Sequence, residues 1–454
     1  MTRTIEADYL VVGAGAAGLA FADALIDHAD VRVVLVDRRH SPGGHWLEAY
    51  PFVRLHQASA FYGVASTVLG GRRLQQRGPE AGLQERAAQP EILDYYRRVL
   101  DRMVESDKVE FLPNSEYADG AVVSCITGER LELAPGCRIV DARYLSPAIP
   151  SETPPPFTVE PGARVVAVND LARLDRAPSR YVIVGSGKTA TDAIVWLLSR
   201  GVDPDAIGWA RPRDPWMLNR AVVQPDPAVF LGIAAHIFES AAASASLDEV
   251  FLRLEDAGVM LRIDRSVTPT MAKAPTLGTW ELDELRSIED VVRRGHLHSV
   301  APGKLHFAEG SVAVPSDTVV VHCAADGLRH RPTTPVWSPD AITLQPIRPG
   351  FPCFGAALVG YVEATRSDDA EKNRLCPPSS FGNTLQDWAR MNVLGTRASQ
   401  SFSAEPDIKA WADSIAINPA RVPSDYPASA ALDDARERLA RFTAPGVERL
   451  AALS

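Results

Sequence analysis

The sequence predicts an α/β fold with two Rossmann-type dinucleotide-binding domains, the second inserted into the first. A short apolar strand, a glycine-rich turn and a helix start follow one another at residues 9–19 and again at residues 180–190, the order of elements typical of a dinucleotide-binding unit. A proline-rich stretch at residues 146–156 separates the two patterns and has the composition of a linker. The valine-rich run at residues 317–322 predicts the strand that closes the inserted domain.

The composition is that of an ordinary globular protein. The 454 residues can bury more than one core, with 46% hydrophobic and 23% charged residues. The net charge of −10 opposes a nucleic-acid partner, whose binding surface would be basic. No apolar run approaches the length of a membrane span, and residues 1–9 lack the apolar region of a signal peptide. We therefore expect a cytoplasmic protein with no membrane partner.

The positions of the cysteines argue against a flavin-linked disulfide reductase. A flavin-linked disulfide reductase passes electrons through two close cysteines, but the cysteines here are scattered and form no C-x-x-C pair. We expect reduced, mostly buried thiols and no metal site, with His296 and His298 on the surface. The cysteines are Cys125, Cys137, Cys323, Cys353 and Cys376.

The first glycine turn has the G-x-G-x-x-G pattern. Gly13 allows the tight turn, Gly15 lets a pyrophosphate approach the backbone, and Gly18 lets the helix pack closely on the strand. The free N–H groups and the dipole of the helix start then favour phosphate. The predicted cofactor-binding residues are Gly13, Gly15, Ala16, Ala17 and Gly18.

An acidic residue follows the first turn at the distance expected for ribose recognition. Residues 31–36 predict the next strand, and Asp37 ends it, about twenty residues beyond the glycines, where a carboxylate can bind a ribose diol. We assign Asp37 and its neighbour Arg38 to the same cofactor site.

The second glycine turn repeats the pattern, with Ala190 in the position of the third glycine. It is not a P-loop, because Val182 stands where that motif requires a glycine. The predicted cofactor-binding residues of this turn are Gly185, Ser186, Gly187, Lys188 and Thr189.

Two arginines favour NADPH over NADH in the second domain. The next predicted strand, residues 206–210, is followed by Arg211 and Arg213. Arginines at this strand end suit the 2′-phosphate of the adenosine ribose. The alternative is that both arginines pair with surface acids.

Residues 43–54 resemble a known flavin-binding segment. They contain G-G-x-W followed by Y-P-x-x-R, similar to class B flavoprotein monooxygenases, which include the flavin-containing monooxygenases, the Baeyer–Villiger monooxygenases and the N-hydroxylases. The resemblance implies that Gly44, His45 and Trp46 contact the cofactor. Phe52 replaces a glycine of the family pattern, and a buried aromatic loop is the alternative interpretation of this stretch.

The resemblance implies FAD in the first domain and NADPH in the second. NADPH would reduce FAD, and O2 would then form a flavin C4a-(hydro)peroxide that oxygenates a small-molecule substrate at nitrogen, at sulfur or at a ketone. With the arginines favouring NADPH in the second domain, the acidic strand end at Asp37 assigns FAD to the first.

The predicted domains follow from this assignment. An FAD-binding domain takes residues 1–150 and resumes at residues 321–454, where C-terminal helices from residue 384 complete it. An NADP-binding domain takes residues 151–320 and contains a helical insertion at about residues 216–260. The insertion could wall a substrate pocket, and a structural role or a homodimer interface is the alternative.

Two neighbouring residues are the catalytic candidates. Gln57 lies near the position where flavin-containing monooxygenases place an amide over the flavin, so the resemblance implies a hydrogen-bonding role. His56 stands where Baeyer–Villiger enzymes have an aspartate, and could orient the nicotinamide or bind substrate. The alternative is that both are ordinary structural polar residues.

The chain also departs from the family in two places. The Baeyer–Villiger fingerprint F-x-G-x-x-x-H-x-x-x-W is incomplete after Phe157, which is followed by neither the histidine nor the terminal aromatic residue. Residues 323–325 read Cys-Ala-Ala where relatives have Ala-Thr-Gly. These departures leave open an NADPH-dependent flavin reductase or oxidase without oxygenation, or a non-catalytic flavoprotein.

Three further segments complete the prediction. Residues 109–140 have the short alternating runs of an antiparallel meander, with residues 137–144 as its last strand. A helix is expected from residue 283 to near residue 295. Residues 342–364 have the pattern of strands with bends, and their resemblance to the family implies the last strand of the FAD-binding domain followed by the start of a helix.

Overall fold

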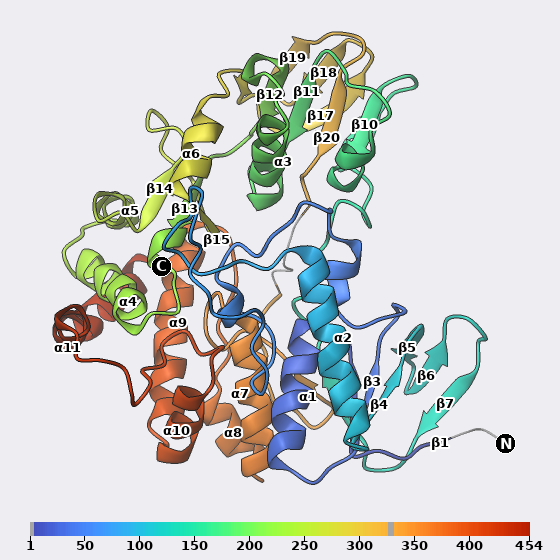
Figure 1. Cartoon of the computed structure of the whole chain (residues 1–454), viewed down its shortest axis with the longest axis vertical. Coiled ribbons are helices and arrows are strands. Elements are labelled where there is room, and N and C mark those ends of the chain that lie inside the picture. The colour runs from blue at the N-terminus through green and yellow to red at the C-terminus, as the bar shows by residue number, and fades with distance from the viewer. Residues whose placement is uncertain (1–3, 326–330) are drawn as a thin grey trace.

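Two parallel sheets organise the chain, and each contains the strand that leads into one of the glycine turns. The computed structural model describes residues 4–325 and 331–454 (Figure 1). Helix α1 (Ala16–His28) connects β2 to β3 of the first sheet, and α2 (Gln89–Glu105) precedes β4. This sheet is parallel throughout, in the order β21 (Ile342–Thr343), β8 (Arg138–Asp141), β2 (Tyr9–Val12), β3 (Val33–Val36) and β4 (Val109–Leu112).

The second sheet is inserted between β8 and β21 of the first. Helix α3 (Lys188–Ser199) follows β11 and begins at the second glycine turn. The nesting confirms the predicted α/β fold with one Rossmann-type unit inside another, and the two units occupy opposite ends of the molecule in Figure 1. This sheet is also parallel, in the order β10 (Arg164–Ala167), β20 (Val319–His322), β11 (Tyr181–Val184), β12 (Ile207–Ala210) and β16 (Val291–Val292).

The meander is shorter than the sequence predicted. Strands β4 and β8, at its two expected ends, instead pair in parallel with β3 and β2 of the first sheet. Strand β4 pairs in parallel because the amphipathic helix α2 connects it to β3, so that β3, α2 and β4 form a β-α-β crossover. The antiparallel part is β5 (Ser115–Ala118), β6 (Ala121–Ser124) and β7 (Arg130–Leu133), with β1 (Thr4–Ile5) parallel to β7.

The helix expected at residues 283–295 was also predicted wrongly. Helix α6 (Thr279–Arg286) begins earlier, where the Glu281 carboxylate accepts the Gly278 N–H at 2.7 Å. It ends at Arg286 because the following residues form β16 and extend the second sheet. A further four-stranded sheet is formed mainly by strands that follow β16 in the chain. Its order is β19 (Gly310–Ala313), β18 (Lys304–Phe307), β17 (Leu297–Ala301) and β9 (Thr158–Val159).

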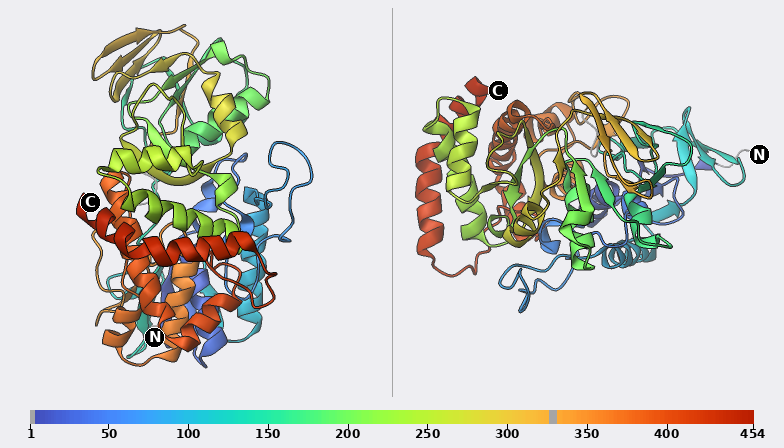
Figure 2. Two further views of the ribbon diagram at one scale, coloured as in Figure 1. Left: turned by 90° about the vertical axis from the view of Figure 1, so that its left-hand side faces the viewer. Right: turned by 90° about the horizontal axis from the view of Figure 1, so that it is seen from above.

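The helical insertion packs on the C-terminal helix. Helices α4 (Pro227–Ala242) and α5 (Leu247–Asp256) form where the sequence predicted helices, and α11 (Ala430–Leu453) lies along α4 (Figure 2). The approach is close, because a Cβ on Gly446 would lie 2.6 Å from the Phe238 carbonyl oxygen. A small sheet joins the insertion to the second unit, in the order β14 (Met260–Arg262), β13 (Pro215–Asn219) and β15 (Met271–Leu277).

Residues 342–364 form one short strand and then a helix, so the helix start is confirmed and the bent strands were predicted wrongly. Only β21 is extended, and α7 (Pro352–Thr365) packs on α1. Glycine is a poor helix former, but a Cβ on Gly360 would lie 2.4 Å from the Phe21 carbonyl oxygen, so close packing requires glycine there. The remaining C-terminal helices are α8 (Asp369–Leu375), α9 (Leu385–Ser403) and α10 (Pro406–Ser414).

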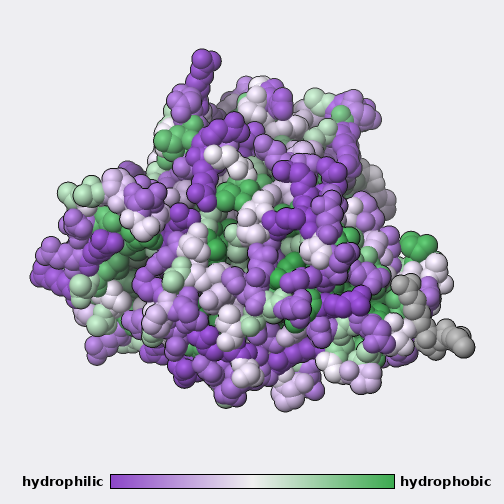
Figure 3. All heavy atoms as spheres, turned by 60° about the horizontal axis from the view of Figure 1, so that its bottom comes forward, coloured by the Kyte–Doolittle hydropathy of each residue, from purple (hydrophilic) through white to green (hydrophobic). Residues whose placement is uncertain are grey.

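The surface is mixed in polarity. Figure 3 shows a face on which hydrophilic residues predominate and hydrophobic residues occur in small groups. Within residues 4–325 and 331–454, no helix is both long enough and apolar enough to cross a membrane.

Candidate functional site

The first glycine turn has the geometry of a phosphate-binding turn. Gly13 has a φ of +113°, and its N–H donates to the Val36 carbonyl at 2.8 Å. A Cβ on Gly18 would lie 1.9 Å from the Gly13 carbonyl oxygen, so only glycine fits there. Among the described residues, no side chain caps the start of α1 at Gly15. The amides of Ala16 and the next residues therefore point toward a space where an anion can bind.

Asp37 is engaged by the backbone around this turn. Its Oδ2 accepts the Ala14 N–H at 2.8 Å, and its Oδ1 accepts the Arg39 N–H at 2.9 Å. Neighbouring Arg38 is exposed and lies 3.1 Å from Glu152. These contacts give Asp37 a structural part in holding the turn, and its ribose contact stays a prediction, as does the assignment of Arg38.

The glycine pair Gly43–Gly44, from the segment that resembles a flavin-binding loop, packs directly on the first glycine turn. Gly44 has a φ of +59°, and a Cβ there would lie 3.1 Å from the Gly15 Cα. Next to it, burial and the nearby Arg39 cation lower the pKa of His45 to about 4. Trp46 is buried, and its Nε1 donates to the Tyr62 hydroxyl at 2.7 Å. Gly44, His45 and Trp46 therefore adjoin the turn that the sequence assigned to FAD.

The chain then crosses to the second unit. The Tyr50 hydroxyl donates to Asp192 of α3 at 2.7 Å. Phe52 stacks on Trp196 of the same helix, with ring centroids 4.7 Å apart and an interplanar angle of 16°. The phenylalanine that replaces a glycine of the family pattern therefore holds the two units together.

The catalytic candidates lie at this junction, with different surroundings. Burial, followed by the nearby cations Lys188, Arg220 and Arg86, lowers the pKa of His56 to about 3. The imidazole is therefore neutral near pH 7 and can act only as a hydrogen-bonding group. In the described structure its Nδ1 is buried without a partner. Gln57 Nε2 donates to the Gly350 carbonyl at 3.3 Å, so the two side chains make separate contacts.

The second glycine turn leaves more open space. Gly185 has a φ of +134°, and its N–H donates to the Ala210 carbonyl at 3.0 Å. A Cβ on Gly187 would meet no described atom within 4 Å. Ser186 and Thr189 are partly exposed. This turn can therefore admit a pyrophosphate on the pattern of the first.

Lys188, at the start of α3, points into an ion cluster. Its ammonium pairs with Asp192 and lies 3.2 Å from Glu281. Arg220 pairs with Glu80 and lies 2.6 Å from Glu281. The interdomain ion cluster, as we name it, has three cations and three anions, namely Arg86, Lys188, Arg220, Glu80, Asp192 and Glu281.

The cluster is buried and electrostatically balanced. Burial alone would raise the pKa of Glu80, but Arg86 and Arg220 lower it to about 2. Arg220, only 1% exposed, also donates from Nε to the His56 carbonyl at 3.0 Å. The cluster therefore fixes the backbone of a catalytic candidate. Sequence reasoning missed these residues, apart from Lys188, because they come from four segments with no shared motif.

The two arginines predicted to bind the 2′-phosphate have different environments. Arg211 is buried, lies 4.3 Å from the Trp209 ring centroid and pairs with Asp214 at 2.9 Å. Its Nε and Nη1 have no hydrogen-bond partner among the described residues, and burial lowers its pKa to about 10. Arg213 is exposed. Arg213 is therefore the cation more accessible to a ligand.

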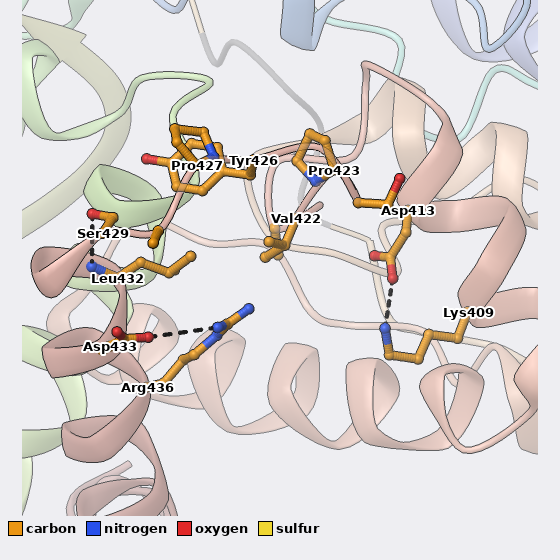
Figure 4. Close-up of a pocket in the computed structure, with 13 residues that line it drawn as sticks. Lys409, Asp413, Val422, Pro423, Tyr426, Pro427, Ser429, Leu432, Asp433 and Arg436 are labelled. Carbon is orange, nitrogen blue, oxygen red and sulfur yellow. Dashed lines mark hydrogen bonds and ion pairs between the residues drawn. The ribbon is translucent and has the colours of Figure 1, made fainter.

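Two cavities lie elsewhere in the protein. One of about 440 Å³ lies between α10 and the start of α11, lined by residues that include Lys409, Tyr426 and Arg436 (Figure 4). Another of about 600 Å³ lies beside β3 and β4. Neither of them is lined by a residue predicted to contact cofactor or substrate.

Comparison with protein families identifies the first unit. Residues 11–60 match a family described as an NAD(P)-binding Rossmann-like domain. The match contains the first glycine turn, β3 and residues 44–57, which lead from that turn to the catalytic candidates. It confirms the dinucleotide-binding character predicted from the glycines.

Comparison with solved structures finds partial likenesses. An open form of cyclohexanone monooxygenase is 17% identical, with a TM-score of 0.49, covering 80% of this chain and 88% of that one. A steroid monooxygenase bound to NADP is 15% identical, with a TM-score of 0.49, covering 79% of this chain and 86% of that one.

Relatives in mycobacteria show far higher sequence identity. The uncharacterized protein Rv2000 of Mycobacterium tuberculosis strain H37Rv is 41% identical over 420 residues, which are 92% of this chain and 78% of the relative. The uncharacterized protein Mb2023 of Mycobacterium bovis matches with the same identity and coverage. Similarity at this level over nearly the whole chain reflects a shared fold and descent. The chain therefore belongs to the family of these mycobacterial proteins.

Proposed function

We propose that this chain is an FAD- and NADPH-dependent monooxygenase of the class B type that oxygenates a small organic substrate. One observation carries the proposal: residues 44–57 run from one glycine turn to the other. Gly44 packs against Gly15 of the first turn, and Tyr50 bonds Asp192 in the helix that follows the second. The catalytic candidates follow at the junction, where two dinucleotides could exchange a hydride directly.

The residues present fit two dinucleotides. The uncapped start of α1, with Gly44 beside it, would hold the FAD pyrophosphate, and the open turn at Gly187 would hold that of NADPH. Arg213 would meet the 2′-phosphate. Bound FAD supplies electron transfer from NADPH and the activation of O2, which no amino-acid side chain provides.

The side chains of the junction would position the reactants and exclude water. Neutral His56 can donate one hydrogen bond and accept one, without carrying a charge into the site. Gln57 uses one amide hydrogen on Gly350, and its second can donate to an oxygen atom of a bound group. Buried Trp46 and partly buried Tyr62, which are hydrogen-bonded to each other, would close one side of the FAD half of the junction.

The reaction of the reduced protein with O2 tests the proposal. Purified protein should carry FAD, and NADPH should bleach it. Stopped-flow mixing of the reduced protein with O2 should then give a long-lived spectral species that forms before oxidised flavin. A colourless protein without affinity for FAD would contradict the proposal.

A flavin reductase or oxidase is the second candidate. The observation that favours it is the incomplete fingerprint after Phe157, a residue that in this structure packs edge-on against buried His322, with ring centroids 5.9 Å apart. That segment therefore has a packing role here. Immediate reoxidation with stoichiometric hydrogen peroxide, and no oxygenated product, would select this candidate.

A further inference from the structure

A cation that has no acidic partner among the described residues lies two positions from Gly350, which contacts the catalytic candidate Gln57. Arg348 precedes α7, and its guanidinium lies 6.0 Å from the ring centroid of Phe230 and 5.9 Å from that of Phe354. Its side chain is only partly exposed. Among the described residues, no carboxylate forms an ion pair with it, and no acceptor takes a hydrogen bond from its guanidinium.

This environment differs from that of two buried arginines, Arg220 and Arg211. Arg220 pairs with two glutamates and Arg211 pairs with Asp214. Burial lowers the pKa of Arg348 to about 10, so the side chain is still protonated near neutral pH. Because the guanidinium is only partly exposed and has no carboxylate partner among the described residues, its charge is less well solvated than one at the open surface, which costs free energy. A ligand that brings the missing negative charge would relieve this cost.

The surroundings indicate what else the ligand carries. Phe230 from α4, Phe61 and Phe351 form an aromatic cluster with centroid separations of 6.0, 5.2 and 5.5 Å. The cluster joins the helical insertion to the first unit. Gly350, two residues from Arg348, accepts the hydrogen bond of Gln57. The cation, the aromatic cluster and a catalytic candidate are therefore contiguous.

We propose that Arg348 binds the carboxylate of the organic substrate, and that the Phe61–Phe230–Phe351 cluster contacts its apolar body. The substrate class is then an organic acid with an aromatic or other apolar portion. A guanidinium forms a bidentate pair with a carboxylate, which would orient the apolar portion relative to Gln57. This inference rests on the proposed function for the statement that the ligand is a substrate.

A pair of thioethers that differ in charge tests the proposal. We would titrate 4-(methylthio)benzoate and its methyl ester into the purified, cofactor-loaded protein by calorimetry, with the wild type and the variants R348M and R348K. The wild type should bind the acid at least tenfold more tightly than the ester. R348M should lose this preference, and R348K should keep part of it.

The control is R441M, because exposed Arg441 also lies over a phenylalanine ring, at 4.9 Å from Phe442. It should behave as the wild type. Unfolding temperature and FAD content verify that each variant is intact. Equal binding of acid and ester by the wild type, or an unchanged preference in R348M, would overturn the proposal.

Two further outcomes separate this inference from the proposed function. Loss of FAD from R348M while R348K retains it would assign the cation to the cofactor, and would overturn the proposal. Tight binding of the acid without formation of its sulfoxide would leave the anion site standing, and would refute the monooxygenase assignment for this ligand.

Discussion

Two regions of this molecule hold positive charge in opposite ways. The interdomain ion cluster matches three cations with three carboxylates between the two units. Arg348, beside the neighbouring aromatic cluster, has no carboxylate partner in the described part of the chain. The difference teaches that the interdomain ion cluster stabilises the architecture, because its charges are paired within the fold. The surroundings of Arg348 are suited to a ligand, because no carboxylate among the described residues pairs with its charge.

The largest effect is expected from breaking the balanced region. Glu80→Gln leaves Arg220 and Arg86 short of one negative charge in a buried site, and should lower the free energy of unfolding by about 3–5 kcal/mol. Chemical denaturation measures it. Asp94→Asn, which breaks an exposed ion pair with Arg97, is the matched control and should change stability far less, because water screens the pair. Equal effects of the two would mean that the cluster does not hold the units together.

Acid should destabilise the fold through His56, which lies beside the same ion cluster. The pKa of this group is lowered by burial and by neighbouring cations to about 3 in the folded state. The unfolded chain therefore takes up the proton first, at its ordinary pKa of about 6.5. Stability should fall as the pH drops below that value, by about 2 kcal/mol at pH 5 from this group.

His56→Asn checks this prediction. The variant should lose less stability between pH 7 and pH 5 than the wild type, when unfolding is followed in denaturant at each pH. His45, whose pKa is lowered to about 4, contributes in the same direction and remains in both proteins. Parallel pH profiles for the variant and the wild type would contradict the prediction.

Removing the unpaired charge should have the opposite sign to breaking the cluster. Arg348→Met should raise the ligand-free stability by about 1–2 kcal/mol, because methionine replaces a partly exposed cation that has no carboxylate partner among the described residues. The unfolding temperature in the absence of organic acids measures it. A destabilised variant would show that Arg348 is satisfied within the fold, and the contrast with the ion cluster would fail.

The two arginines predicted to bind the 2′-phosphate show a similar contrast, between a paired cation and an exposed one, with a smaller expected effect. Arg211 is paired with Asp214, whereas Arg213 is exposed. Arg213→Gln should therefore weaken NADPH about tenfold, equivalent to about 1.4 kcal/mol, and leave NADH nearly unchanged. Steady-state KM values for the two nucleotides measure this change. An equal loss for both nucleotides would indicate a general structural effect.

The sequence predicted most of what depends on local spacing. The glycine turns, the strands leading into them and the helices α4 and α5 need only short-range patterns, and they formed where expected. Strands β4 and β8 were misassigned because the choice between a meander and a parallel sheet depends on distant partners. The extent of helix α7 was underestimated because its glycines suggested bends, whereas packing on α1 requires the glycine at position 360 within the helix.

The site was less predictable than the fold, for the same reason. Gly44 and its neighbours lie beside the first turn, as their short spacing from it predicted. The ion cluster joins residues 80, 188, 220 and 281, and no regular spacing along the chain predicts such a set. That no acid among the described residues pairs with Arg348 depends on residues distant in the chain, so local spacing could not predict it either.

The insertion of one sheet into another affects how the chain can fold during synthesis. Strand β8 ends at Asp141, and its outer neighbour β21 begins only at Ile342. At roughly 5–20 residues per second, a ribosome needs about 10–40 s to make the intervening stretch. For that time the nascent first unit presents an unpaired strand edge, a site for wrong pairing. Rapid folding of the inserted unit would keep the two ends of the first unit close, and so shorten the search for the last strand.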